Sequence, residues 1–259
     1  MWPLLSFLCY DFGLESLKNE FVKILSTLTL SALDTLCSQG SAHKALKIKM
    51  ASALLNLMNK SYASPSYFPS TITDIHEGKV LTVNDALSKP ECRALINFIE
   101  QSPNVTTTHQ ERTREYTYRH NDRLQLDDSS FACFLFARMK PLLATHPSFA
   151  NAVGLNPNIR LYRYEEGMRF DAHYDQSVTT ANGTTKWTVL YYLNTLSLAS
   201  GGSTDFYING HEKHEAASVS PIEGSACLHI HGDECLLHKG AEVTLGVKYL
   251  LRTDIVFSE

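Results

Sequence analysis

The stretch NIRLYRYEEGMRFDAHYD, residues 158–175, consists of two short β-rich runs separated by a turn that contains Gly167. Further runs of this kind follow to residue 257, separated by Gly, Asn, Asp and Pro, which interrupt strands. Short strands that follow helices in this way predict a β-sandwich or jelly roll with helices packed on its outside. The eight expected strands lie in NIRLYRY, RFDAHYD, KWTVLYYLN, STDFYI, AASVSP, SACLHIH, ECLLH and VKYLLRTDIVF.

Two helices are expected upstream of these strands, because the chain there carries helix-start signals before apolar residues at helical spacing. The first helix has Ser88 at its N-cap and Glu91 three residues later, which is the pattern of a capping box. The second begins at Asp128 or Ser129 and ends near Pro141. Both helices are expected to support the strands from outside.

The N-terminal part of the chain has a different pattern. Apolar residues recur at helical spacing between about residues 14 and 60, which predicts two amphipathic helices. Residues 61–73 contain two prolines and many hydroxyl side chains, which is typical of a linker. We therefore expect a helical extension and linker over residues 1–74 and a main domain over residues 75–259, with helical support in 75–156 and a jelly-roll core in 157–259.

The composition argues against several classes of protein. The 23 basic and 27 acidic residues give a net charge of −4 without a dense run of Lys and Arg, so we expect no nucleic-acid partner. The six cysteines form no Cys-x-x-Cys pair and no disulfide framework, which favours a reducing compartment and a cytoplasmic location. The apolar N-terminus is too short to span a membrane, so no transmembrane segment is expected. The absence of acidic residues between Asp34 and Asp74 leaves organelle targeting as an alternative.

The segment DAHYDQS, residues 171–177, places His173 and Asp175 two residues apart. Side chains two apart on a strand point to the same face, so an imidazole and a carboxylate can bind one ion from adjacent positions. In a chain with 11 His and 27 acidic residues, such a pair also arises by chance on a surface. The metal-site hypothesis therefore depends on a third ligand.

The third ligand has several candidates, and a second criterion is needed to choose among them. Fe(II) bound by two His and one carboxylate keeps positions open for O2 and a chelating co-substrate. A dicarboxylate co-substrate needs a cation for its far end, so a cation is expected at a fixed distance after the third ligand. The candidates are His211, His214, His229, His231 and His238.

Two of these histidines are followed by a lysine ten residues later, namely His229 by Lys239 and His238 by Lys248. Lys239 lies in a turn-like segment, whereas Lys248 begins a strand run in which it shares one face with Arg252. A cation that points into a barrel is unfavourable unless it meets an anion. The pair of His238 and Lys248 is therefore the better choice.

Several motifs in this half of the chain occur in the order found in a known family. They are RLYRYEEGMRFDAHYD, TVLYYLN, GGSTDFY and LLHKGAEVTLGVKYLLRTDIVF. By these motifs, residues 80–257 resemble the iron(II)- and 2-oxoglutarate-dependent dioxygenases, and most closely the catalytic-domain group of prolyl 4-hydroxylases. The resemblance implies an α+β fold built on a double-stranded β-helix, or jelly roll, with supporting helices.

The resemblance also implies the ligands and co-substrates of the site. By it, His173, Asp175 and His238 bind Fe(II), and Lys248 holds the distal carboxylate of 2-oxoglutarate. O2 is the second co-substrate, and ascorbate is implied as a further cofactor.

Three more residues have both a functional and an ordinary interpretation. Tyr164 and Thr204 match family positions that hydrogen-bond 2-oxoglutarate, and otherwise they are a half-buried tyrosine and a strand threonine. Arg252 departs from the Trp- and Lys-rich ending of the collagen-modifying members. It either shares or replaces the role of Lys248, or pairs with Asp254 or a neighbouring acid.

The implied reaction is hydroxylation of an unactivated C–H bond, with succinate and CO2 as co-products. A peptidyl proline is the leading substrate, although a small molecule fits the same core. The polar segment of residues 118–128 supplies Arg119, Asn121 and Arg123 as candidates for substrate or lid contacts, and its ordinary interpretation is a solvated loop.

Two other functions use the same residues. A catalytically silent metal-binding module of this fold would lack a ligand or the cation, and neither is missing from the sequence. A zinc hydrolase could use the same three ligands to activate water, but it leaves Lys248 unexplained. The oligomeric state is not predicted.

Overall fold

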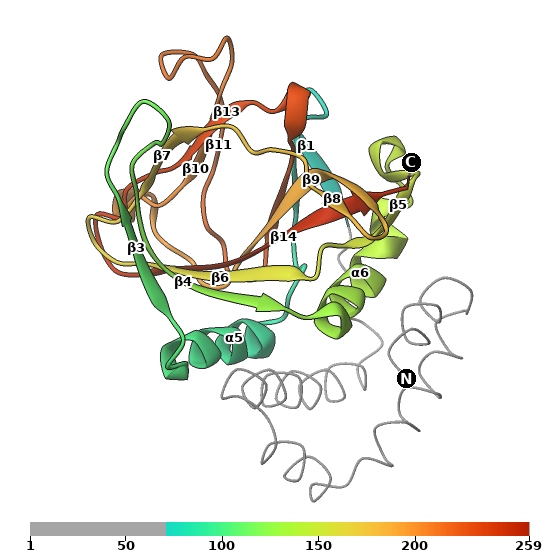
Figure 1. Cartoon of the computed structure of the whole chain (residues 1–259), viewed down its shortest axis with the longest axis horizontal. Coiled ribbons are helices and arrows are strands. Elements are labelled where there is room, and N and C mark those ends of the chain that lie inside the picture. The colour runs from blue at the N-terminus through green and yellow to red at the C-terminus, as the bar shows by residue number, and fades with distance from the viewer. Residues whose placement is uncertain (1–70, 259) are drawn as a thin grey trace, which may run out of the picture. The chain divides into compact units, whose positions relative to one another are not determined.

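The eight β-rich runs expected after residue 157 all form strands in the computed structural model, which describes residues 71–258 (Figure 1). Their bounds differ from the expected runs by a few residues. The strands are β6 (Asn158–Tyr164), β7 (Phe170–His173), β9 (Gly183–Tyr192), β10 (Thr204–Tyr207), β11 (Glu215–Val219), β12 (Ala226–Ile230), β13 (Leu237–Gly240) and β14 (Lys248–Phe257).

Six strands lie outside the expected runs. Five of them occur before residue 157, so the segment expected as helical support contributes strands as well as helices, and β1 begins inside the expected linker. The predicted helices between residues 14 and 60, and most of the linker, lie outside the described residues. The six strands are β1 (Ile72–His76), β2 (Val80–Val83), β3 (Thr106–Gln110), β4 (Arg119–Asp127), β5 (Ala152–Leu155) and β8 (Thr179–Thr180).

The strands form one antiparallel sheet that curves into a nearly closed barrel (Figure 1). Along its main path the strand order is β1-β2-β12-β9-β14-β6-β4-β7-β13-β10-β11. Neighbours in the sheet come from distant parts of the chain, which is the arrangement of a jelly roll. The predicted fold class is therefore confirmed.

The polar segment of residues 118–128 is not a solvated loop, because most of it forms β4. Asp122, Leu124 and Leu126 alternate along this strand and are all buried. The strand period is visible in the sequence, but Asp122 occupies one position of the buried face that it shares with Leu124 and Leu126, and it pairs there with Arg163 of β6 at 2.6 Å. Because of this ion pair, a charged residue stands where an apolar one is expected, and the strand looks like a polar segment in the sequence.

The helix α5 (Lys89–Gln101) begins as predicted. The Ser88 hydroxyl accepts from the backbone N–H of Glu91 at 3.4 Å, and the Glu91 carboxylate accepts from the backbone N–H of Ser88 at 2.7 Å. These two bonds complete a capping box. Glu91 is buried and also pairs with Arg138 of the second helix, so the cap connects the two helices.

The helix α6 (Ser129–Leu143) has Asp128 as its N-cap, so Asp128 is the correct one of the two predicted starting residues. It ends at Leu143, two residues beyond Pro141, in agreement with the predicted end near that proline. Proline removes one backbone hydrogen bond from the last turn. The burial of Leu142 and Leu143 in the core offsets this loss.

We expect Ser88→Ala to lower the free energy of unfolding by about 1–2 kcal/mol, because it removes a side-chain cap from a buried helix end. Urea denaturation measures this change. Ser130→Ala is the control, since Ser130 is exposed in the first turn of α6 and its loss should cost less than about 0.5 kcal/mol. Equal effects of the two changes would show that the cap adds nothing.

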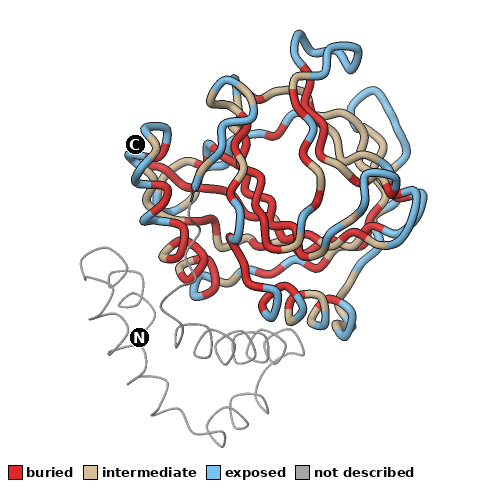
Figure 2. Tube along the Cα trace, turned by 180° about the vertical axis from the view of Figure 1, so that it is seen from behind, coloured by how far each residue is buried: buried red, intermediate tan, exposed pale blue. Residues whose placement is uncertain are grey.

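Buried residues run along the strands, and exposed residues gather in the turns between them (Figure 2). Within the barrel, Tyr162, Tyr164 and Tyr192 belong to the buried cluster and bring hydroxyl groups into an otherwise apolar interior. Buried His238 and Lys248 lie in the same interior. No helix of residues 71–258 is long and apolar enough to cross a membrane.

Candidate active site

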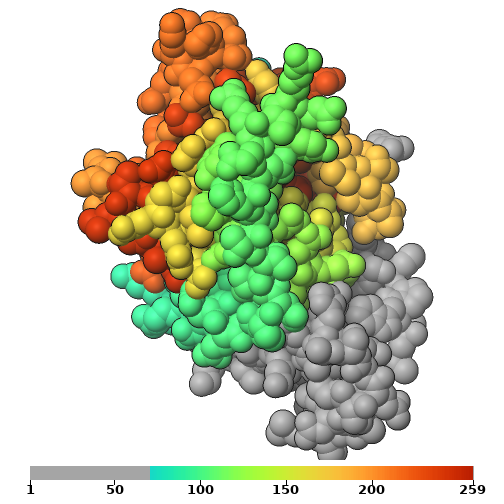
Figure 3. All heavy atoms as spheres, turned by 60° about the vertical axis from the view of Figure 1, so that its left-hand side comes forward, coloured from blue at the N-terminus to red at the C-terminus, as the bar shows by residue number. Residues whose placement is uncertain are grey.

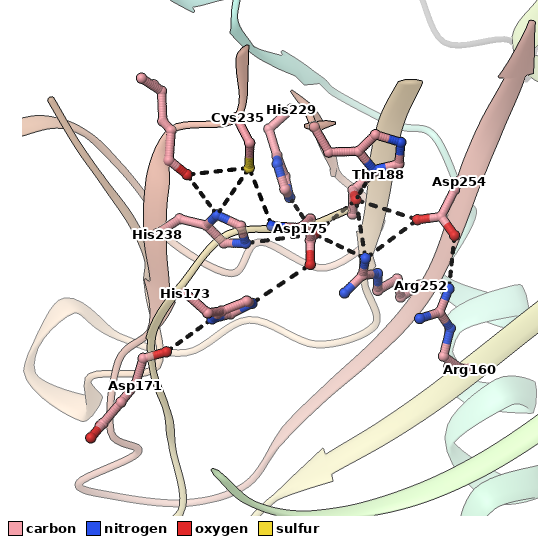
Figure 4. A network of polar contacts seen from close by, with 12 residues as sticks. Arg160, Asp171, His173, Asp175, Thr188, His229, Cys235, His238, Arg252 and Asp254 are labelled. Atoms are coloured by element: carbon pink, nitrogen blue, oxygen red, sulfur yellow. Dashed lines mark hydrogen bonds and ion pairs between the residues drawn. The ribbon is translucent and has the colours of Figure 1, made fainter. Parts of the chain in front are cut away.

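The sheet brings together the three side chains that the sequence proposes as metal ligands. His173 ends β7 and lies opposite His238 of the antiparallel neighbour β13. Asp175 follows two residues after His173, in the extended segment beyond the strand. One ligand atom from each of the three residues lies within 4.8 Å of the others, and Figure 4 shows the two imidazoles and the carboxylate turned toward one another.

Both imidazoles present Nε2 to Asp175. The Nδ1 of His173 is 2.9 Å from the backbone oxygen of Asp171, and the Nδ1 of His238 is 2.9 Å from that of Leu236. A carbonyl oxygen only accepts, so Nδ1 carries a hydrogen in each ring, and Nε2 is the atom that can bind a metal once it has no proton. The Nε2 atoms of His173 and His238 are 3.7 Å and 3.6 Å from the Asp175 carboxylate. Such backbone bonds orient metal-binding histidines.

The protonation of the two imidazoles differs. Burial lowers the pKa of His173 to about 3, so this ring is neutral at physiological pH. Burial also acts to lower the pKa of His238, but the Asp175 carboxylate outweighs it and the pKa of His238 rises to about 9. A metal ion at this position would therefore displace a proton from His238.

Asp175 is held through one of its two oxygens. The Thr188 hydroxyl donates to Oδ2 at 2.9 Å, and Arg252 Nη2 lies 2.9 Å from the same atom. Burial would raise the pKa of Asp175, but Arg252 outweighs it and keeps the pKa well below its usual range. Within residues 71–258 no hydrogen bond reaches Oδ1. The carboxylate is therefore ionised and fixed, with Oδ1 available as a ligand.

Arg252 belongs to this end of the pocket. Its Nη2 also lies 3.5 Å from Asp254, and Asp254 in turn binds Arg160 of β6 at 2.7 Å (Figure 4). Arg252 thus pairs with Asp254, as its ordinary interpretation predicts, and it also makes a shorter contact with Asp175. The sequence did not reveal the contacts of Arg160 and Thr188, because each lies far along the chain from Asp254.

Lys248 is the first residue of β14 and lies opposite Tyr164 of β6. Its side chain is only 2% exposed, and among the described residues no hydrogen bond or ion pair to its ammonium is found. The ammonium lies 5.7 Å and 5.6 Å from the ring centres of Tyr164 and Tyr192. Burial lowers the pKa of Lys248 to about 8. A buried cation of this kind is unfavourable without an anion, so the surroundings are suited to one.

Tyr164 and Thr204 line the same pocket as Lys248. The Tyr164 hydroxyl accepts from the Asn121 amide at 2.9 Å, and the Thr204 hydroxyl lies 2.8 Å from that of Tyr192. Sequence reasoning missed Tyr192, although its position in the apolar strand run TVLYYLN is a signal for an inward aromatic residue.

A glycine is required beside Lys248. Gly202 has a φ of +73°, and a side chain there would meet the Leu196 side chain at 2.9 Å and the Lys248 side chain at 3.4 Å.

The other candidate residues lie in different surroundings. His211 and His214 are exposed, and Lys239 pairs with Glu212 at 3.1 Å, so the alternative clamp Lys239 has an anion already. Arg123 does not line the pocket and hydrogen-bonds to Gln125.

Two further histidines are buried near Asp175. His229 lies 3.7 Å from Asp175 with an unpaired Nε2, and it forms a second possible metal-binding group with Cys235 and His238. His231 lies 3.3 Å from the Thr188 hydroxyl and does not line the pocket.

One pocket is lined by the three proposed ligands together with Lys248. The site therefore joins a group that can hold a divalent metal to a buried cation that forms no ion pair within residues 71–258.

Comparisons with known proteins add to this geometry. Residues 159–253 match the 2OG-Fe(II) oxygenase superfamily. A prolyl-4-hydroxylase from Pseudomonas putida is 15% identical, with a TM-score of 0.51 over 70% of this chain and 93% of that chain. A prolyl hydroxylase from Trichoplax adhaerens, solved with a hypoxia inducible factor oxygen degradation domain peptide fragment, is 15% identical, with a TM-score of 0.50 over 89% of this chain and 94% of that chain. No curated protein matches the sequence. At these identities the likeness to the solved structures concerns the fold.

Proposed function

We propose that this chain, whose residues 159–253 form a 2OG-Fe(II) oxygenase domain, hydroxylates an unactivated C–H bond of a peptidyl proline. The observation that carries the proposal is the buried Lys248, which shares one pocket with the group of His173, Asp175 and His238. A plain metal site has no use for such a cation. An enzyme that binds a dicarboxylate beside its metal requires one.

The residues present fit Fe(II). His173 offers the Nε2 lone pair of a neutral ring, and His238 offers its Nε2 once a metal has displaced the proton. Asp175 offers an oxygen that accepts no hydrogen bond within the described chain. Two imidazoles and one carboxylate are a typical ligand set of non-haem Fe(II) oxygenases and leave positions open for other ligands. Bound Fe(II), with 2-oxoglutarate and O2, would supply the oxidant for C–H hydroxylation, with succinate and CO2 as co-products. Ascorbate is proposed as a further cofactor from the resemblance to prolyl 4-hydroxylases.

The protein's own contribution is to bind and orient the co-substrate. We assign the distal carboxylate of 2-oxoglutarate to the Lys248 ammonium and to the hydroxyls of Tyr164 and Thr204, which line the same pocket. Asn121 and Tyr192 hold these two hydroxyls in place.

We assign Arg252 to Asp175 and not to 2-oxoglutarate, because its guanidinium already contacts that carboxylate at 2.9 Å.

A peptide substrate is supported by the Trichoplax relative, whose structure contains a peptide fragment. A zinc hydrolase on the same three ligands would leave Lys248 as a buried cation without an ion pair among the described residues. A silent module of this fold needs neither an intact ligand set nor the cation, and the pocket retains both. The oxygenase is thus the function that uses both the proposed ligands and Lys248.

Metal analysis of protein purified without oxygen, combined with a succinate assay, tests the proposal. We expect bound iron, succinate formation from 2-oxoglutarate, and a gain of one oxygen on proline peptides measured by mass spectrometry. Zinc content with hydrolysis and no succinate would indicate the hydrolase. Metal binding without turnover would indicate the silent module.

The affinity for 2-oxoglutarate should depend on pH through Lys248. Only the charged ammonium pairs with the carboxylate, and the pKa of Lys248 is lowered to about 8, so the group is charged below this pH and loses its proton above it. We expect the affinity of iron-loaded protein to fall as the pH rises through about 8, approaching one decade per pH unit. Titration between pH 6.5 and 9.5 measures this. Lys248→Arg should flatten the dependence, because a guanidinium stays charged. The same pH dependence in both proteins would assign it to another group.

A further inference from the structure

Arg119 lines the same pocket and has no anionic partner in residues 71–258. Its guanidinium lies over the Phe170 ring at 4.6 Å and over the Tyr162 ring at 5.2 Å. Its Nε is buried without a hydrogen-bond partner. Two aromatic rings therefore hold this cation in place, and its charge is left for another molecule.

The charges of the pocket leave Arg119 unpaired after the proposed co-substrate has bound. Within the described chain, the lining contains three cations, Arg119, Lys248 and Arg252, and a single carboxylate, Asp175. Arg252 pairs with Asp175 at 2.9 Å, and the proposed function assigns Lys248 to 2-oxoglutarate. Fe(II) and the dianion of 2-oxoglutarate bring equal and opposite charges. Arg119 is therefore the one cation of the described lining that has neither an ion pair nor an assigned anion.

Arg119 and Lys248 serve different parts of the pocket. Lys248 begins β14, Arg119 begins β4, and β6 lies between these two strands. Arg119 pairs across the sheet with Phe170, whose ring stacks on the imidazole of His173 at 3.7 Å. One ring thus separates the Arg119 cation from a proposed metal ligand.

The outer position of Arg119 suits a substrate that enters from solvent. Arg119 is partly exposed, whereas Lys248 is 2% exposed, so the two cations lie at different depths. Figure 3 shows the β3–β4 segment, in green, running across one face of the molecule. A molecule that enters past β4 would meet Arg119 before it reaches the inner end of the pocket.

We propose that Arg119 binds a carboxylate of the primary substrate, so that the enzyme acts on a proline with a negative charge close to the reacting ring. This inference rests on the proposed oxygenase function. A guanidinium pairs with a carboxylate through two parallel hydrogen bonds, which a neutral amide of the same shape cannot reproduce. The carboxylate is either an acidic side chain next to a peptidyl proline or the proline's own terminal carboxylate.

Matched substrate pairs test the inference. One arm uses proline peptides with Glu or Gln at each flanking position, and the other compares proline and N-acetylproline with their amides. Succinate formation above the substrate-free rate gives the KM of each compound. We expect the carboxylate member of at least one pair to have a KM lower than its amide by at least about tenfold. The arm that responds identifies the source of the carboxylate.

Variants assign the effect to Arg119. Arg119→Met keeps a long side chain over Phe170 and should abolish the preference for the carboxylate, and Arg119→Lys should restore part of it. Arg123→Met is the control, because Arg123 lies on the same strand outside the pocket and should leave the preference intact.

Several results would overturn the inference. One is equal KM values within every pair, and another is a preference for the carboxylate that survives Arg119→Met. A third is loss of 2-oxoglutarate binding in the Arg119→Met variant. A fourth is that the wild-type protein forms succinate but no carboxylate compound stimulates it. If the wild-type protein neither binds 2-oxoglutarate nor forms succinate, the proposed function itself fails, which is a distinct result.

Discussion

We expect His173→Ala, Asp175→Ala and His238→Ala each to abolish iron binding and 2-oxoglutarate turnover. Each change removes one of three protein ligands whose donor atoms lie within 4.8 Å of one another. Loss of a residue that merely supports a ligand typically weakens metal affinity by about 10–100-fold, so loss of a ligand should exceed about a hundredfold. Equilibrium binding of Fe(II) without oxygen, followed by a succinate assay, measures both effects.

The controls come from the second buried group. His229 and Cys235 form a possible metal-binding set with His238, and neither belongs to the proposed triad. We expect His229→Leu and Cys235→Ser to retain iron, and circular dichroism should show that all variants are folded. Iron loss on changing His229 with retention on changing His173 would move the metal to the other set.

Lys248→Ala should raise the KM for 2-oxoglutarate by at least about tenfold and leave iron affinity nearly unchanged. A charged hydrogen bond in a buried pocket contributes about 1.5–3 kcal/mol, and each 1.4 kcal/mol corresponds to about one decade in affinity. The ammonium forms no ion pair within the described chain, and its removal leaves the distal carboxylate of the co-substrate unpaired. Steady-state kinetics at saturating iron measures the change.

Two other cations make this prediction specific. Lys239→Ala is the matched control, because Lys239 also follows a histidine by ten residues but pairs with Glu212 near the surface. Its KM for 2-oxoglutarate should stay within about twofold of wild type. Arg252→Ala should instead weaken iron retention, because Arg252 holds the proposed ligand Asp175. If Arg252→Ala raises this KM and Lys248→Ala does not, the distal carboxylate belongs to Arg252.

Local features of the site could be predicted from the sequence. The spacing of His173 and Asp175 and the capping box at Ser88 depend only on neighbouring residues. The strand period also predicts that Lys248 and Arg252 share a face, and both line the pocket. The choice between Lys239 and Lys248 followed from the same period, and the structure places only Lys248 in the pocket.

Contacts set by the register between strands could not be predicted. The ion pair of Arg160 with Asp254 joins residues 94 apart in the sequence, and it exists because β6 and β14 are neighbours in the sheet. The contact of Arg252 with Asp175 likewise depends on where the segment after β7 crosses β14. Sequence pattern shows which face a side chain occupies, but the anion that it meets there depends on the tertiary fold.

The position of β14 between β6 and β9 has a consequence for folding. Its partners lie many tens of residues earlier in the chain, so the sheet cannot be continuous across its centre until these long-range pairings form, which slows folding. Lys248 and Arg252 enter the pocket in the same event. Partly folded chains should therefore have little affinity for co-substrate. Iron and 2-oxoglutarate should bind only the native state and so raise the melting temperature of the protein.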